Sequence, residues 1–142
     1  MNKKFIAKAA TIIHAPVSKV WQALVNPEII KQYLFNTDVI SDWKEGSPIL
    51  YRGEWQGKPF EDKGTILKIE DEKQLVSTHW SPLSGVPDTP ENRHTVTYSL
   101  SAKGDSTEVA ITQDNNASEE EKEDSEQLWK TVLAGMKKLL EG

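Results

Sequence analysis

Residues 118–140 read SEEEKEDSEQLWKTVLAGMKKLL and predict one long amphipathic helix. Ser118 and Glu121 have the spacing of a capping box, in which the serine oxygen accepts from a backbone N–H and the glutamate reaches back. Acidic residues fill the first turns and Lys137 and Lys138 lie near the end, which suits the helix dipole. The apolar positions form one stripe, made of Leu128, Trp129, Val132, Leu133, Met136, Leu139 and Leu140. This stripe has to pack on an apolar surface.

The segment before this helix predicts that surface, because its apolar residues alternate with polar ones as in strands. Gly64 reads as a bulge or a place of close packing, residues 56–58 as a hairpin connection, and residues 81–91 as the longest loop. Short turns between consecutive strands predict an antiparallel meander. The expected strands cover about residues 4–14, 39–40, 49–55, 60–69, 75–80, 94–100 and 107–111.

Two short helices are expected after the first strand. Asn26 can cap the second of them and Pro27 can take its first position. The order β-α-α-β×6-α predicts an α+β fold, with a strongly curved antiparallel β-sheet of about six or seven strands wrapped around the long C-terminal α-helix. A length of 142 residues fits a single domain, residues 1–142. The face of the first helix consists of Val17, Val20, Trp21, Leu24 and Val25.

The composition excludes several classes of function. There is no cysteine, which excludes a disulfide framework, thiolate catalysis and cysteine-ligated metals. A net charge of −5 without a basic stripe argues against nucleic acid as a partner. No apolar run approaches the roughly 20 residues of a membrane span, and no signal-peptide core follows Lys3-Lys4, so a cytoplasmic protein is expected.

The aromatic side chains point to a cavity between the sheet and the last helix. Aromatic walls suit an apolar ligand because they offer a large contact area at little cost in entropy. Trp21 and Trp129 lie on helical stripes and are expected in the core, and Trp43 in a turn. The candidate cavity residues are Tyr33, Phe35, Tyr51, Trp55, His79, Trp80, His94, Tyr98, Leu133 and Met136.

No catalytic motif, metal-ligand set or cofactor-binding pattern is found, so the expectation is a protein that is not an enzyme and uses no cofactor. His79 and His94 flank the long loop and could supply either a polar contact in the cavity or an acid–base group. Asp62 is interpreted as part of a solvated face of alternating charges. Arg52 and Arg93 could clamp a ligand carboxylate or form cross-strand ion pairs.

Several segments together resemble a known family. Residues 16–24 (PVSKVWQAL) followed by Asn26-Pro27-Glu28 look like the opening of helix-grip proteins of the START-like, Bet-v-allergen-like superfamily, also called SRPBCC. Residues 41–48 (SDWKEGSP), 53–55 (GEW), 62–64 (DKG) and the pattern WxxVLxxMKKLL of residues 129–140 are similar to the branch named after the activator of heat-shock-protein-90 ATPase. The resemblance implies a helix-grip fold and an open cavity, used in the superfamily for lipids, sterols, hormones or polyketides.

Three functions stay open at this point. The first is a carrier or sensor that binds a small apolar or aromatic ligand in the cavity. The second, which the family name suggests, is an interaction protein that stimulates the ATPase of a chaperone partner. The third is a cyclase or hydrolase that uses His79 or His94. Unpaired sheet edges permit either a monomer or a dimer.

Overall fold

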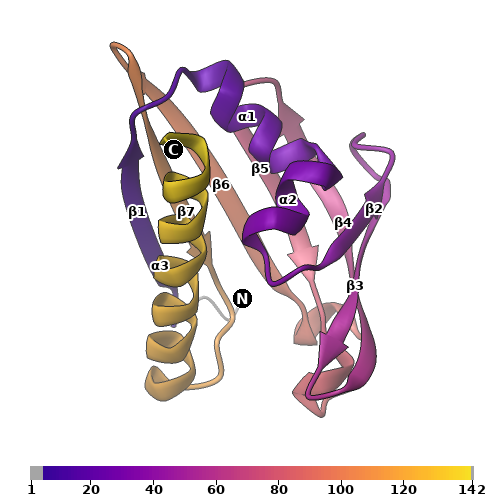
Figure 1. The fold of residues 1–142 in the computed structure, drawn as a ribbon. Helices are drawn as coiled ribbons and strands as arrows, with labels where there is room; N and C mark the ends of the chain where they lie inside the picture. Colours follow the sequence, from indigo (N-terminus) through magenta and orange to yellow (C-terminus); the bar gives the residue numbers. More distant parts are fainter. Residues whose placement is uncertain (1–4, 142) are drawn as a thin grey trace.

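The computed structural model describes residues 5–141, including every side chain in that range except those of Trp55 and Leu83. Within it the chain forms seven strands, three α-helices and two short 3-10 turns (Figure 1). The elements are β1 (Ala7–Ile13), α1 (Val17–Val25), α2 (Pro27–Tyr33), β2 (Asp38–Ser41), β3 (Pro48–Trp55), β4 (Lys58–Glu70), β5 (Gln74–His79), η1 (Pro82–Ser84), η2 (Pro90–Asn92), β6 (His94–Lys103), β7 (Ser106–Gln113) and α3 (Glu119–Glu141).

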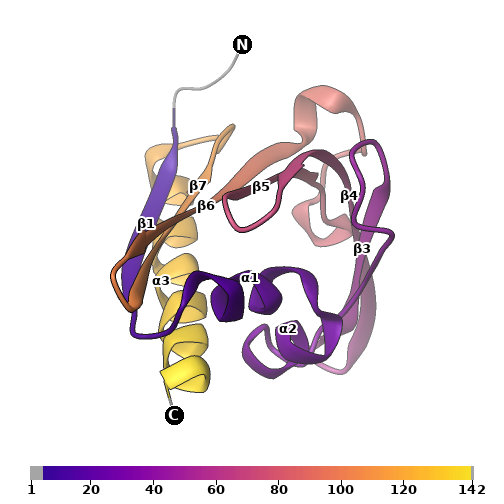
Figure 2. The same ribbon diagram turned by 90° about the horizontal axis from the view of Figure 1, so that it is seen from above.

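The seven strands make one antiparallel sheet in the order β1-β7-β6-β5-β4-β3-β2. Strands β2 to β7 are a meander, as predicted, and β1 closes the row by pairing with the last strand. Seen from above, the sheet bends from β1 over β6 and β5 to β3, with the three helices inside the curve (Figure 2). The predicted α+β helix-grip architecture is confirmed.

The C-terminal helix α3 packs against the β1 end of the sheet, and α1 and α2 cover the rest of the concave side (Figures 1 and 2). Near its C-terminal end, α3 is tied to both neighbours by hydrogen bonds: Lys19 Nζ of α1 donates to the Leu140 carbonyl at 2.8 Å, and Lys137 Nζ donates to the Ile12 carbonyl of β1 at 2.7 Å. Lys19 thereby satisfies a carbonyl at the C-terminal end of α3, where no partner within the helix is left.

Of the two hydrogen bonds of the predicted capping box at the start of α3, one is observed. Ser118 Oγ accepts a hydrogen bond from the Glu121 N–H at 3.1 Å. The Glu121 carboxylate does not complete the expected box and lies 3.8 Å from His94 Nε2. The α2 start follows the prediction, since Asn26 Oδ1 accepts from the Glu28 N–H at 3.0 Å and Pro27 is the first helical residue.

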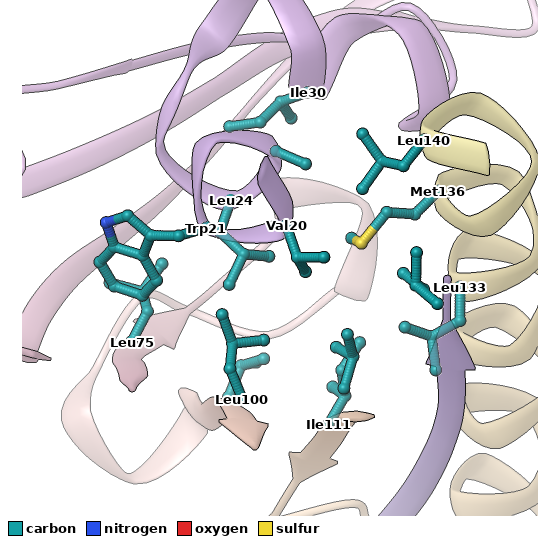
Figure 3. Packing of buried hydrophobic residues seen from close by; sticks show 14 of the residues in the cluster. Val20, Trp21, Leu24, Ile30, Leu75, Leu100, Ile111, Leu133, Met136 and Leu140 are labelled. Atoms are coloured by element: carbon teal, nitrogen blue, oxygen red, sulfur yellow. The ribbon is translucent and has the colours of Figure 1, made fainter. Parts of the chain in front are cut away.

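The core lies between the helices and the inner face of the sheet (Figure 3). Met136 and Leu133 of α3 face Val20 of α1 and Ile111 of β7, and all four side chains are almost completely buried. Tyr33 ties α2 to α1, because its hydroxyl donates to the Ala23 carbonyl at 2.6 Å. The elements around the core are therefore held both by apolar contact and by single long-range hydrogen bonds.

The strand β4 begins two residues earlier than predicted, and this changes its register. The turn before it contains only Gln56 and Gly57, both with positive φ (53° and 80°), so that Trp55 pairs with Lys58. Positive φ at both central residues is typical of the tight two-residue hairpin. Two further residues along each strand the same register places Gly53 opposite Phe60, and then Tyr51 opposite Asp62. Directly opposed residues lie on the same face of a sheet.

Candidate functional site

A pocket of about 210 Å³ lies where α3, the segment after α2 and strands β3 to β7 meet. Its wall is mostly apolar, with a few polar groups. The lining residues are Leu34, Phe35 and Thr37 after α2; Tyr51, Phe60, Asp62, His79, Val96, Tyr98 and Gln113 on the strands; and Leu128, Trp129 and Val132 on α3. We call it the helix–sheet pocket.

Four of the ten predicted cavity residues line this pocket: Phe35, Tyr51, His79 and Tyr98. They come from the segment after α2, from β3, from β5 and from β6, so only the folded sheet brings them together. A fifth, Tyr33, lines a neighbouring pocket of about 20 Å³ that also touches Tyr51 and Tyr98.

Of the other five predicted residues, four are found elsewhere in the described structure. Leu133 and Met136 point to the core instead, because they lie on the side of α3 that faces α1 and β7 (Figure 3). Trp80 holds the long loop, with its Nε1 donating to the Val86 carbonyl at 3.0 Å. His94 lines a different, polar pocket, and the side chain of Trp55 lies outside the described residues.

The pocket contains a hydrogen-bonded pair that the sequence did not reveal. Asp62 Oδ2 lies 2.9 Å from His79 Nε2, and only 15% of the Asp62 side chain is exposed. The interpretation of Asp62 as a member of a solvated face is therefore wrong. A three-residue connection at residues 56–58 would have placed it on the outer face, and the two-residue turn places it opposite Tyr51 on the inner face.

Tyr51 completes this polar corner. Its ring stands edge-on to the His79 ring, with 5.6 Å between centroids and an angle of 66°. Desolvation, above all, raises the pKa of Tyr51 to about 12; the negative charge of Asp62 acts in the same direction, and a hydrogen bond with Ser77 opposes it. Tyr51 therefore presents a neutral hydroxyl at ordinary pH.

The opposite wall is aromatic. Tyr98 and Trp129 meet edge to face, with 5.9 Å between centroids and an angle of 90°. Burial raises the pKa of Tyr98 well above its usual value. Trp129 Nε1 donates to Gln113 Oε1 at 2.9 Å, which fixes the indole against the pocket. A tryptophan expected in the core thus serves both the core and the pocket.

The mouth of the pocket carries two exposed apolar side chains from opposite sides. Phe35 is 62% exposed and Leu128 is 50% exposed, although both line the pocket. Phe35 and the following Asn36 have positive φ values of 51° and 58°. Non-glycine residues rarely adopt this conformation, so the segment at the mouth is held in an uncommon backbone shape.

Gln113 separates the helix–sheet pocket from a second, larger and more polar pocket of about 630 Å³. Its Nε2 donates to Asn116 Oδ1 and to Ser125 Oγ, each at 3.2 Å. In the second pocket His94 Nδ1 lies 2.8 Å from the Asp114 carbonyl. Because a carbonyl only accepts, Nδ1 carries the hydrogen in this contact. His79 and His94 are register partners on β5 and β6, yet they bond to different groups.

The two arginines form ion pairs. Arg52 Nε lies 2.6 Å from Glu61 Oε2 across the β3–β4 hairpin. Arg93 Nε lies 2.8 Å from Asp88 Oδ1, and its guanidinium also reaches Thr78. Arg52 thus forms the predicted cross-strand ion pair, whereas Arg93 pairs with a residue of the loop before β6.

Residues 5–141 contain neither a candidate metal cluster nor a candidate membrane-spanning helix. No group of three or more histidine, aspartate or glutamate side chains there could hold a metal ion. Likewise, none of the helices in this range has the length and apolar character needed to cross a membrane.

Solved structures with the same fold are numerous. A protein from Cytophaga hutchinsonii, solved in solution, is 56% identical, with 99% of this chain and 97% of that chain covered and a TM-score of 0.86. The Aha1 dimer from Colwellia psychrerythraea is 20% identical, with 96% of both chains covered and a TM-score of 0.74. A putative protein of the dynemicin biosynthetic locus is 15% identical, with 97% of this chain but 48% of that chain covered and a TM-score of 0.80.

No curated protein matches the sequence. The model of one family matches residues 14–141, which span the structure from the end of β1 to the end of α3. The resemblance of the sequence segments to the heat-shock-protein-90 activator branch of the SRPBCC superfamily is thereby confirmed, and the chain belongs to the family of Activator of Hsp90 ATPase homolog 1-like proteins.

Proposed function

We propose that this protein reversibly binds a small apolar or aromatic molecule in the helix–sheet pocket, as a carrier or sensor. The observation that carries the proposal is the pocket itself, a mostly apolar hollow walled by Tyr51, Tyr98 and Trp129. Small-molecule sites are typically of this kind, with a few polar groups that set orientation.

The volume limits the size of the occupant. An apolar cavity of about 150 Å³ holds benzene, so about 210 Å³ suits a molecule of one or two rings. Burial of about 200 Å² of apolar ligand surface would contribute roughly 5 kcal/mol before the cost of ordering the partners. Binding of a small apolar probe with a Kd of about 0.2 mM or weaker is therefore expected.

The mouth supports the same proposal. Phe35 and Leu128 keep apolar surface in water at the point where a ligand would enter. The superfamily uses such cavities for apolar ligands, and one structural neighbour is encoded in the locus of dynemicin biosynthesis. The hypothesis of a chaperone partner rests on the family name and the Aha1 neighbour and stays a prediction.

The proposal is tested with naphthalene, indole and benzofuran as probes and nuclear magnetic resonance of the ¹⁵N-labelled protein. The Trp129 indole N–H gives a resonance from the pocket wall and should shift on titration, together with backbone signals of Val96 and Tyr98. Val96→Phe, which places a ring in the pocket, should abolish these shifts. Val76→Phe is the matched control, because Val76 alternates with the buried Leu75 and Ser77 and so lies on the outer face of β5.

Two results would count against the proposal. One is the absence of shifts with all three probes. The other is a set of shifts that Val96→Phe leaves intact while the variant remains folded. Recovery of the probe chemically unchanged after incubation is expected for a binding protein, and a modified product would instead support the enzyme hypothesis.

A further inference from the structure

We infer that the ligand of the helix–sheet pocket carries a hydrogen-bond donor, a hydroxyl or an N–H group, and that the side chain of Asp62 accepts it. This inference rests on the proposed function, since it specifies the chemistry of the molecule that the pocket binds. The expected ligand is a hydrogen-bond donor on a small aromatic or apolar body.

The first observation is an unpaired acceptor. Asp62 Oδ1 is buried and has no hydrogen-bond partner, and it is the one such atom among the side chains that the structure describes. Buried polar atoms are paired in the great majority of cases, so an exception at a pocket wall indicates a missing partner. Because Asp62 lines the pocket, a molecule in the pocket is the partner within reach.

The second observation is that Asp62 is held in place from its other side. Asp62 Oδ2 is 2.9 Å from His79 Nε2, and the His79 ring in turn packs edge-on against Tyr51. Tyr51 is engaged with Ser77 and keeps its proton at ordinary pH, since its pKa is raised to about 12. The carboxyl group is thus oriented by an ordered neighbourhood, which is what a recognition site needs.

The third observation concerns Gln113, another polar side chain of the wall. Gln113 uses its oxygen for Trp129 and its nitrogen for Asn116 and Ser125. It is therefore committed to the protein, while Asp62 retains an unused acceptor. An anionic ligand would meet the negative charge of Asp62, and a ligand that only accepts would leave Oδ1 unpaired, so a donor is the group that the wall selects.

The test compares indole with benzofuran, which have the same shape but carry an N–H and an ether oxygen at the same place. Isothermal titration calorimetry of the whole protein should show indole binding about tenfold more tightly, or better, as expected for a hydrogen bond to a charged acceptor. Nuclear Overhauser contacts should connect the indole N–H side of the probe with the ring protons of His79 or Tyr51.

Asp62→Asn tests the assignment to this residue. Its amide oxygen can face His79 while its NH₂ group takes the place of Oδ1, so the preference for indole should fall to about one or reverse. Glu61→Gln is the matched control, because Glu61 is the neighbouring carboxylate on the same strand and pairs with the exposed Arg52. It should leave the preference unchanged. Comparing the ratios between variants cancels the different water solubilities of the two probes.

The outcomes are distinguishable. If indole, benzofuran and naphthalene all fail to bind, both the proposed function and this inference fail, and if naphthalene alone binds, only this inference fails. If indole and benzofuran bind the unmodified protein equally well, the proposed function stands and the donor inference is overturned. If indole is preferred but Asp62→Asn keeps the preference, the assignment to Asp62 is overturned. Should Asp62→Asn fail to fold, the affinity ratio and the Overhauser contacts in the unmodified protein still decide.

Discussion

Two glycines show that the atoms facing a position determine whether it can hold a larger residue. A Cβ added at Gly64 would lie 1.9 Å from the Thr78 carbonyl oxygen of β5, which real Cβ atoms essentially never do. A Cβ added at Gly135 of α3 would lie 3.7 Å from atoms of Tyr33, an ordinary contact distance. The sequence already indicated a close approach at Gly64, because glycine weakens a strand unless something needs the space.

Gly64→Ala should therefore lower the free energy of unfolding by about 3 kcal/mol or more, since backbone atoms of β4 and β5 must move apart. Gly135→Ala should instead raise it by about 0.5–1 kcal/mol, because alanine is the better helix former and reduces the entropy of the unfolded chain. Urea denaturation of both variants measures the two effects. Equal effects in the two variants would show that the approach of β4 to β5 is not as close as described.

Asp62 shows why the candidate site was only partly predictable. Its residue type and its strand are evident in the sequence, but the face of the sheet depends on whether the turn before it has two or three residues. A shift of one residue exchanges the two faces completely. The signal that could have decided it is Gln56-Gly57, a pair suited to a two-residue turn with positive φ at both positions.

At the scale of elements the sequence was more informative. Helices α1, α2 and α3 follow from apolar spacing and end signals, and all seven strands lie within one to three residues of the predicted bounds. These features depend on local sequence, whereas the direction of a helix face depends on its neighbours. Leu133 and Met136 were therefore predicted on the correct helix but assigned to the cavity. In the structure both side chains belong to the core, where α3 faces α1 and β7.

Leu133 and Leu128 of α3 separate the contributions of the core and of the pocket mouth. Leu133→Ala should cost about 2–5 kcal/mol, because the side chain is 2% exposed and its removal leaves a cavity. Leu128→Ala, at 50% exposure, should cost less than about 1 kcal/mol. Chemical denaturation measures both. A near-neutral Leu133→Ala would mean that α3 does not dock on the core as described.

The whole molecule places its three tyrosines in one neighbourhood, although they come from α2, β3 and β6. The pKa values of Tyr33, Tyr51 and Tyr98 are all raised, in each case mainly by burial. For Tyr33 and Tyr98 the effect of a neighbouring tyrosine is added. The fold thus gathers three tyrosine hydroxyl groups that stay protonated in the folded state at an alkaline pH at which they ionise in the unfolded chain.

Tyr51 gives the prediction that reports on this cluster. Its pKa is about 12 in the folded protein and about 10 in an unfolded chain. Between these values the folded state binds more protons than the unfolded state. The contribution of Tyr51 to the free energy of unfolding is therefore fully present below pH 10 and is lost as the pH rises towards 12. Two pKa units correspond to about 2–3 kcal/mol.

In Tyr51→Phe this contribution is missing, whereas the lysines titrate alike in both proteins. The difference in unfolding free energy between variant and unmodified protein, measured with urea from pH 8 to 12, should stay constant to about pH 9.5 and then change by about that amount in favour of the variant. Parallel curves across the whole range would show that the Tyr51 hydroxyl is solvated and that the polar corner of the pocket is open to water.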